Sequence, residues 1–240
     1  DAPLLTAARR IAWGKFMNAG QTCIAPDYVL VDRSISSEFL DSIQQAIQEF
    51  YGADPQVSPA YGRIVSRHHF DRLLGYLSTG RTICGGAHQA DDLYIAPTVL
   101  ANVPAEAPVM HEEIFGPILP VLPISGVHEA ITFLRGRPSP LAVYLFTRDT
   151  AIEQRVIAET RSGGVCINDT MSQALGHHLP FGGLGESGMG RYHGKASFDA
   201  FSHERAVLRR SLTIDPSMRY PPRRTRMGLL KKVYRFLLGT

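Results

Sequence analysis

The chain has 240 residues, 44% of them hydrophobic, which is enough to bury a sizeable core in one or two domains. Twenty-two glycines and sixteen prolines favour a mixed α/β fold over a helical bundle. Residues 205–240 hold ten Lys or Arg and one Asp, a net charge of +9, so the whole-chain charge of +3 leaves −6 for residues 1–204. This mildly acidic body gives no support to nucleic-acid binding.

The cysteines indicate thiols rather than disulfides. Cys23, Cys84 and Cys166 are odd in number, far apart, and without the Cys-x-x-Cys spacing of a zinc site. Free thiols fit a reducing cytoplasm, and no apolar run approaches the roughly 20 residues that span a bilayer. The adjacent histidines at 68–69 and 177–178 are predicted to be surface residues, and no metal site is expected. The first residue is Asp1 rather than Met, which suggests a fragment or a processed product.

The first half of the chain reads as alternating elements. Residues 3–17 carry apolar side chains at helical spacing, with Pro3 suited to the first turn. The pattern then predicts a strand at 28–32, an amphipathic helix at 34–51, a helix at 66–77 and an extended segment at 94–103. Residues 118–124 read as an edge or irregular strand, because Pro120 and Pro123 lack the backbone N–H that a central strand uses.

The second half of the chain has a more regular alternation of predicted helices and strands. It predicts a helix at 127–134, a buried strand at 141–147, a helix at 150–160 and a strand at 164–168. Strands that alternate with helices indicate parallel crossovers. We therefore expect an α/β fold with an open, mostly parallel sheet flanked by helices. Residues 1–215 are expected to form one domain, and residues 216–240 a separate basic tail.

Cys23 lies in a turn that could display its thiol. A glycine and small and polar residues surround it, including Asn18 and Thr22, and a hydrophobic strand follows. Most free cysteines are small buried hydrophobes, so the thiol alone leaves both a structural and a nucleophilic role open. Cys84 and Cys166 have strand-like neighbours and are predicted to be structural.

Two further runs could carry chemistry. At 111–117, paired acids precede Phe115 and a Gly-Pro turn, so Glu113 could accept hydrogen bonds from ribose hydroxyls while a ring covers a flat heterocycle. The alternative is a solvated acidic turn with Phe115 in the core. The glycine-rich segment 180–191 contains a formal G-x-G-x-x-G, but no strand precedes it and no helix opens at it. We predict a mobile or tightly folded loop that lines a pocket, rather than a phosphate-binding loop.

Together these runs resemble the aldehyde dehydrogenase family. Residues 20–23 (Gly-Gln-Thr-Cys), 112–117 (Glu-Glu-Ile-Phe-Gly-Pro) and 180–190 (Pro-Phe-Gly-Gly, then Ser-Gly and Gly) are similar to its three motifs, in the same order. Residues 25–28, 94–98 and 191–195 are similar to class 3 members. The resemblance covers about residues 4–222. It implies NAD- or NADP-dependent oxidation of medium- and long-chain aliphatic or aromatic aldehydes, by a homodimer.

The resemblance also implies residue roles. Cys23 would attack the aldehyde carbon as a thiolate, with its own N–H holding the oxyanion. Glu113 would bind the nicotinamide ribose, and Phe115 would pack beside the nicotinamide. Asn18, Thr22, Phe181, Gly182 and Gly183 would line the substrate pocket or its loop.

Several family parts are missing from this sequence. An N-terminal cofactor domain, a Glu-Leu-Gly-Gly motif that supplies the general base, and an Asn of the oxyanion hole would all lie upstream. We therefore expect a catalytic-domain fragment that is inactive alone. The alternative function is that of a catalytically inactive truncated subunit with a structural or partner-binding role.

The C-terminal tail combines apolar and basic residues in a helical pattern. Leu229, Leu230, Val233 and Leu237 share one face of a predicted helix, with cations elsewhere, as in helices that lie on membranes. The prediction is peripheral contact with the cytoplasmic face of a membrane, and the alternative is a disordered basic tail or a subunit contact.

Overall fold

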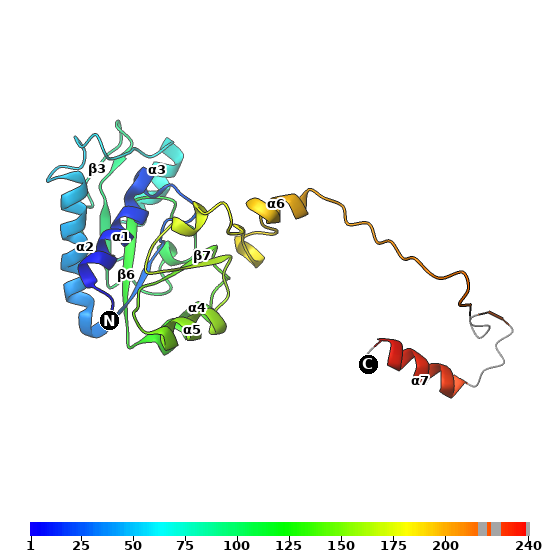
Figure 1. Ribbon diagram of the computed structural model, residues 1–240. Coiled ribbons are helices and arrows are strands. Elements are labelled where there is room, and N and C mark those ends of the chain that lie inside the picture. Colours follow the sequence, from blue (N-terminus) through cyan, green and yellow to red (C-terminus); the bar gives the residue numbers. More distant parts are fainter. Residues whose placement is uncertain (216–219, 222–226, 239–240) are drawn as a thin grey trace. The chain divides into compact units, whose positions relative to one another are not determined.

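The computed structural model describes residues 1–215, 220–221 and 227–238 (Figure 1). The chain divides into two compact units, residues 1–201 and 202–240. The predicted division at 215/216 into catalytic domain and tail stays a prediction. The second unit contains α7 (Met227–Leu238). The amphipathic prediction for the tail rests on the side chains of Leu229, Leu230, Val233 and Leu237. These side chains lie outside the part of the chain that the structure describes. None of the described helices combines the length and apolarity that crossing a bilayer requires.

The N-terminal half of the first unit alternates helices and strands much as predicted. In chain order the elements are α1 (Leu4–Phe16), β1 (Val29–Asp32), α2 (Ser36–Tyr51), α3 (Arg67–Leu74), β2 (Arg81–Cys84), β3 (His88–Gln89), β4 (Tyr94–Ile95) and β5 (Thr98–Ala101). The helix α2 buries the predicted face, with Phe39, Ile43 and Ile47 in the core. The sequence reading missed β2 and β3.

The C-terminal half follows the predicted rhythm closely. Its elements are β6 (Ile118–Ile124), α4 (Val127–Arg135), β7 (Ala142–Leu145), α5 (Thr150–Glu159), β8 (Gly164–Ile167) and α6 (Gly194–Ala200). The helices pack in pairs, α1 beside α2 and α4 beside α5 (Figure 1).

One four-stranded sheet and one separate strand pair make up the mostly parallel arrangement. A four-stranded sheet has the order β1-β6-β5-β2, in which β1, β6 and β5 are parallel and β2 is antiparallel. The strands β7 and β8 form a separate parallel pair. This confirms the predicted α/β class with a mostly parallel sheet flanked by helices.

Residues 118–124 were predicted to form an edge or irregular strand, and the edge alternative was wrong. The strand β6 lies inside the sheet, with Pro120 opposite Leu100 of β5 and Pro123 opposite Val31 of β1. Residues three apart in a strand direct their N–H positions to opposite sides, so each ladder loses only one donor. Burial of the strand on both faces outweighs that loss, because every residue from 118 to 122 is buried.

The hydrophobic core has a large and a small part. The large part gathers α1, α2, α3 and the four-stranded sheet around fully buried residues such as Phe70, Leu73 and Ile118. The small part consists of Ile131, Val143 and Val156, between α4, α5 and β7. The four-stranded sheet and the β7–β8 pair therefore rest on different cores.

Candidate functional site

The turn that carries Cys23 is built on an unusual backbone. After α1, the residues Asn18, Ala19 and Gly20 have φ values of +53°, +52° and +73°, which is the left-handed region. The Asn18 side chain donates to the Gln21 carbonyl at 3.0 Å and stabilises this turn. Cys23 follows it and is exposed, as the sequence suggested. No described hydrogen bond uses the backbone N–H of Cys23, so this donor is available to a ligand.

Two side chains that the sequence reading passed over hold the turn in place. The Gln21 amide donates to the carbonyls of Asn18 and Arg63, at 3.0 and 2.9 Å, while its oxygen accepts from the Val65 N–H at 2.8 Å. On the other side, the Tyr144 hydroxyl donates to the Ile24 carbonyl at 2.7 Å. Gln173 in turn donates to the Tyr144 oxygen at 3.2 Å. The thiol is thus presented from a turn that is tied directly to residues 63–65 and to Tyr144.

The other cysteines differ from Cys23. Burial raises the pKa of Cys84, in β2, to about 11. Burial also raises the pKa of Cys166, in β8, and the charge of Asp169 adds to the effect. A thiol with a raised pKa is a poor nucleophile at neutral pH, because the thiolate is the reactive form. The structural role predicted for Cys84 and Cys166 agrees with these surroundings.

The structure brings the Cys23 turn and the Glu113 turn together. A Cβ placed on Gly20 would lie 2.2 Å from the Gly116 carbonyl oxygen, so the two backbones are in direct contact. Glycine is needed at residue 20 both for this approach and for its positive φ. Two runs that are almost a hundred residues apart therefore form one surface.

The Glu113 turn is fixed by contacts to its backbone. The Asp27 carboxylate accepts from the Ile114 N–H at 3.0 Å, and Arg72 donates to the carbonyls of Glu113 and Ile114. Phe115 has a left-handed φ of +46°. The ring nitrogen of His69 lies 3.1 Å from the Phe115 carbonyl oxygen. The surface prediction was therefore wrong for His69, which is half-buried.

The two acids of this turn have different surroundings. Glu112 accepts from the Tyr76 hydroxyl at 3.0 Å and pairs with Arg72 at 3.7 Å. Glu113 is exposed, and its carboxyl has no hydrogen bond or salt bridge among the described residues. Partial burial and the charge of Asp27 raise the pKa of Glu113. Its carboxylate is therefore the one left available to hydroxyl groups of a ligand.

A buried charge cluster lies beneath this surface. Lys15, in α1, is fully buried, and its Nζ has no hydrogen-bond partner among the described residues. Burial lowers the pKa of Lys15 to about 8, while the charges of Asp27 and Glu113 oppose that shift. Burial raises the pKa of Asp27, which the Lys15 charge opposes. The sequence pattern did not predict that Lys15 is buried, because a lysine within the apolar face of a helix reads only as an interruption of that face.

The glycine-rich loop lies on another part of the structure. Phe181 exchanges two backbone hydrogen bonds of 2.9 Å with Tyr192. Cβ atoms on Gly182 and Gly183 would lie 2.2 Å from the Gly190 oxygen and 2.1 Å from the Ser187 oxygen. The loop is thus tightly folded, the second of the two predicted alternatives, and it contains a three-residue 3-10 helix at Gly185–Ser187 where a dinucleotide-binding loop would open an α-helix. Thr22 is half-buried beside Cys23 in the first turn.

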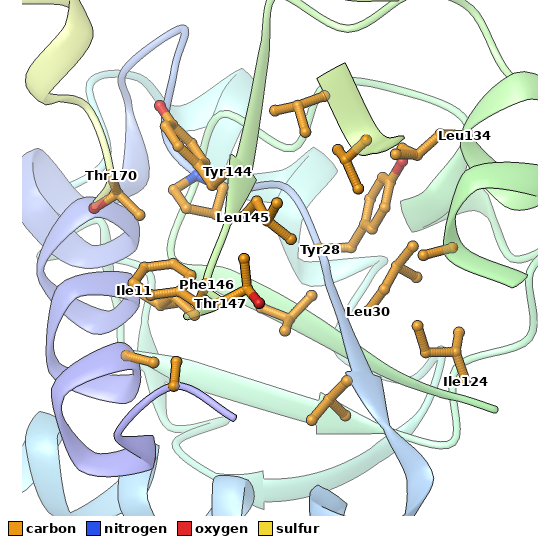
Figure 2. Close-up of a pocket in the computed structure, with 18 of the residues that line it drawn as sticks. Ile11, Tyr28, Leu30, Ile124, Leu134, Tyr144, Leu145, Phe146, Thr147 and Thr170 are labelled. Atoms are coloured by element: carbon orange, nitrogen blue, oxygen red, sulfur yellow. The ribbon is translucent and has the colours of Figure 1, made fainter. Parts of the chain in front are cut away.

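A largely apolar cavity of about 440 Å³ opens in the first unit. Figure 2 shows Tyr28, Leu30 and Tyr144 among the residues that line it. Its lining includes Cys23, Tyr28, Leu30, Tyr144 and Leu145. Nowhere in the described part of the chain do three or more His, Cys, Asp or Glu side chains gather as metal ligands would.

The turn with the exposed Cys23 thiol contacts the turn with the exposed Glu113 carboxylate, on a mostly parallel α/β scaffold, and this defines a domain suited to thiol chemistry. A family model described as "Aldehyde dehydrogenase family" matches residues 1–207. The chain belongs to the aldehyde dehydrogenase family.

Similar proteins place the chain near one branch of this family. The dog "Aldehyde dehydrogenase, dimeric NADP-preferring" is 48% identical over 229 residues, which are 95% of this chain and 51% of the dog protein. The bovine protein of the same name is 48% identical over 223 residues, covering 92% of this chain and 93% of that protein. Human "Aldehyde dehydrogenase family 3 member B1" is 50% identical over 230 residues, 94% of this chain and 49% of the human protein.

Solved structures agree with these relatives. "Substrate bound state of Staphylococcus Aureus AldH" matches with a TM-score of 0.87 and 44% identity, over 97% of this chain and 51% of that one. The Mycobacterium tuberculosis aldehyde dehydrogenase complexed with NAD+ matches with a TM-score of 0.74 and 29% identity, over 84% and 43% of the two chains. The chain spans about half the length of the dog and human relatives and of both solved structures.

Proposed function

We propose that this chain takes part in the NAD(P)-dependent oxidation of an aldehyde to a carboxylic acid, with Cys23 as the nucleophile. The observation that carries the proposal is the contact between Gly20 and Gly116, which sets the thiol turn beside the Glu113 turn. The thiol and the carboxylate are exposed on neighbouring backbones, and both turns are rigidly held. Such positioning is what a reaction between two bound groups requires.

Cys23, Glu113 and Phe115 have different roles in the proposed reaction. The Cys23 thiolate adds to the aldehyde carbon, and the new C–S bond leaves a hemithioacetal whose oxygen the free Cys23 N–H is available to bind. When bound, NAD(P) would supply the acceptor for the hydride that leaves that carbon. The product on Cys23 is a thioester, and water cleaves its C–S bond to release the acid and the thiol. Glu113 is proposed to hold the nicotinamide ribose and Phe115 to pack beside the nicotinamide, since the Glu113 carboxylate is exposed and unpaired.

The proposal has finer parts, and the names of the relatives support two of them. Names that read "dimeric" and "NADP-preferring" support a homodimer and either cofactor, NAD or NADP. We propose medium- and long-chain aliphatic or aromatic aldehydes as substrates and the cytoplasm as the location. Asn18, Thr22, Phe181, Gly182 and Gly183 are proposed to line the substrate pocket or its loop.

A hybrid enzyme tests the proposal. In the dog enzyme, the residues that match this chain are replaced by the chain itself, and NAD(P)H formation is followed with hexanal. We expect activity that Cys23→Ala abolishes and Cys84→Ala retains, because Cys84 lies in β2 with a raised pKa. An active Cys23→Ala hybrid would contradict the proposal.

The isolated chain provides a second measurement. We expect the 240-residue chain alone to form no NADH with hexanal, because the relatives use about twice its length. NADH formation that Cys23→Ala abolishes would overturn this expectation while supporting the role of the thiol.

A further inference from the structure

Cys23 occupies a central position of a closed reverse turn. The Ala25 N–H donates to the Thr22 carbonyl at 2.9 Å, so residues 22–25 form a β-turn around Cys23 and Ile24. The Thr22 carbonyl and the Cys23 N–H belong to the same peptide unit. Because a peptide unit is planar and rigid, a bond that orients the Thr22 carbonyl also orients the Cys23 N–H.

The next peptide unit but one is held by Tyr144, in β7. The Ile24 carbonyl accepts from the Tyr144 hydroxyl at 2.7 Å, and this carbonyl shares a peptide unit with the Ala25 N–H. One rigid unit therefore joins the phenol on one side to the Thr22 carbonyl on the other. Among the described hydrogen bonds, only the one from Tyr144 reaches the Ile24 carbonyl. The orientation of this unit thus depends on the phenol.

The bonds around Tyr144 form one continuous chain that begins at Gln173. The Gln173 amide donates to the Tyr144 oxygen at 3.2 Å, the phenol donates to Ile24, and the Ala25 N–H donates to Thr22. The chain ends at the Cys23 N–H, which no described hydrogen bond uses. All of its donors point in one direction, and bonds in such a chain polarise one another by about 10–30% per bond. The Cys23 N–H is therefore a stronger donor than an isolated amide.

The segment that carries Gln173 has a strained backbone. Asn168 and Met171 have left-handed φ values of +58° and +63°. The Asn168 side chain accepts from the Thr147 N–H at 2.8 Å and donates to the Thr147 carbonyl at 2.7 Å. The hydroxyl of Thr170, which is fully buried, donates to the main chain of α1 at 2.7 Å. Such strain persists only where the surroundings impose it, and it gathers at functional sites.

The Tyr144 hydroxyl also lies within electrostatic range of the thiol. Burial raises the pKa of Tyr144, hydrogen bonding by Gln173 and by the Met171 main chain opposes the rise, and the charges of Cys166 and Cys23 add to it. The phenol therefore keeps its proton at neutral pH. It is a permanent donor to the Ile24 carbonyl.

We propose that Tyr144 is a positioning residue of the thiol site, whose hydroxyl orients and polarises the Cys23 N–H through the peptide units of the turn, with Gln173 as its support. The inference rests on the proposed function, because it is there that the Cys23 N–H binds an oxyanion. A phenol that only stabilised the fold would affect all reactions of the thiol alike. A phenol that orients the N–H favours those reactions that build an oxyanion.

A comparison of two reactions of the same thiolate tests the proposal in the 240-residue chain. With p-nitrophenyl acetate, the Cys23 sulfur adds to the ester carbon, and the resulting oxyanion expels p-nitrophenolate and leaves an acetyl thioester. With iodoacetamide, the sulfur displaces iodide from a saturated carbon, and no oxyanion forms. Both rates are measured on the Cys23 peptide by mass spectrometry, so the other cysteines do not contribute. The ratio of the two rate constants cancels the fraction of thiolate.

Tyr144→Phe should lower the ratio of acylation to alkylation about tenfold, because a misplaced oxyanion donor slows only the acylation. The matched control is Tyr61→Phe. The Tyr61 hydroxyl donates to the Ile95 carbonyl at 2.8 Å in the large core, so the control loses the same kind of bond. Its ratio should stay within about twofold of that of the unchanged chain, since the loss of one such bond affects stability alone.

A ratio that falls in Tyr144→Phe and not in Tyr61→Phe supports the proposal. An unchanged ratio in Tyr144→Phe, or an equal fall in both variants, overturns it. If Tyr144→Phe does not fold, Gln173→Met, which keeps the phenol, takes its place: a lowered ratio supports the proposal and an unchanged ratio overturns it. Neither reagent needs an aldehyde or NAD(P), so a negative result here is distinct from an inactive hybrid enzyme.

Discussion

Replacing Gly20 by alanine should destabilise the chain far more than a matched change elsewhere. The new Cβ would lie 2.2 Å from the Gly116 oxygen, 2.5 Å from its carbon and 3.0 Å from the Lys15 oxygen, all of them backbone atoms. A left-handed backbone with φ of +73° costs about 1–2 kcal/mol for a residue with a Cβ. Forced separation of packed groups adds about 1–3 kcal/mol. The two terms give about 2–5 kcal/mol, a large part of the roughly 5–15 kcal/mol that stabilises a domain.

Gly86 offers the control. Its φ is +82°, but a Cβ there would meet only the Thr82 side chain, at 3.5 Å or more, which is ordinary contact. Gly86→Ala should therefore cost about 1–2 kcal/mol from the backbone alone. The assay is urea unfolding at equilibrium, with comparison of midpoints at unchanged slope. If the two variants lose equal free energy, the close contact between the turns is wrong. Iodoacetamide labelling of Cys23 should change in Gly20→Ala and not in Gly86→Ala.

Three further predictions concern the site and the tail. Tyr144→Phe leaves the Ile24 carbonyl without its partner, so it should lower the free energy of unfolding by about 1–3 kcal/mol in urea titrations. Lys15 has a folded pKa of about 8, below its ordinary 10.5, so the unfolded chain binds more protons between these values and stability should rise with pH there, by up to about 3 kcal/mol. Lys15→Met should remove that rise. The basic tail should bring the chain to liposomes of anionic lipid in flotation assays, more strongly than a chain ending at Pro222.

Opposite results would be equally informative. An unchanged unfolding midpoint in Tyr144→Phe would mean that its hydroxyl bonds are not stabilising. A slope that persists between pH 8 and 10 in Lys15→Met would assign the pH dependence to another group. Equal liposome binding by the two chains would exclude the tail as the membrane contact.

Periodicity was sufficient for most of the fold. The helices and strands of the C-terminal half appear where apolar spacing placed them, because local pattern and burial agree there. Periodicity failed at Pro120 and Pro123, because burial of the strand on both faces outweighs the loss of two hydrogen-bond donors. It also failed at the short antiparallel strand β2, whose side chains are half-buried or exposed. Local sequence carries little information about which strands pair with one another and which strand lies at the edge of a sheet.

The site was only partly accessible to sequence reasoning. The exposed Cys23 and the Glu113 turn were identified from residue types, but their contact depends on two glycines, Gly20 and Gly116, far apart in the chain. The buried Lys15 could not be predicted, since charged residues are rarely buried without a partner. The bond from Tyr144 joins residues 120 positions apart, and no spacing rule predicts such a pair.

The unequal sizes of the two hydrophobic cores imply that the chain opens in stages. The smaller core has three buried residues, and β7 shares no ladder with the four-stranded sheet within the described residues. Side-chain bonds, such as those from Arg137 to the Met110 and Ala105 carbonyls, connect this region to the rest. We therefore expect residues 127–167 to form the less stable cooperative unit and to open at a lower free energy than β5 and β6. Because Tyr144 belongs to that unit and holds the Ile24 carbonyl, each such opening also releases one support of the Cys23 turn.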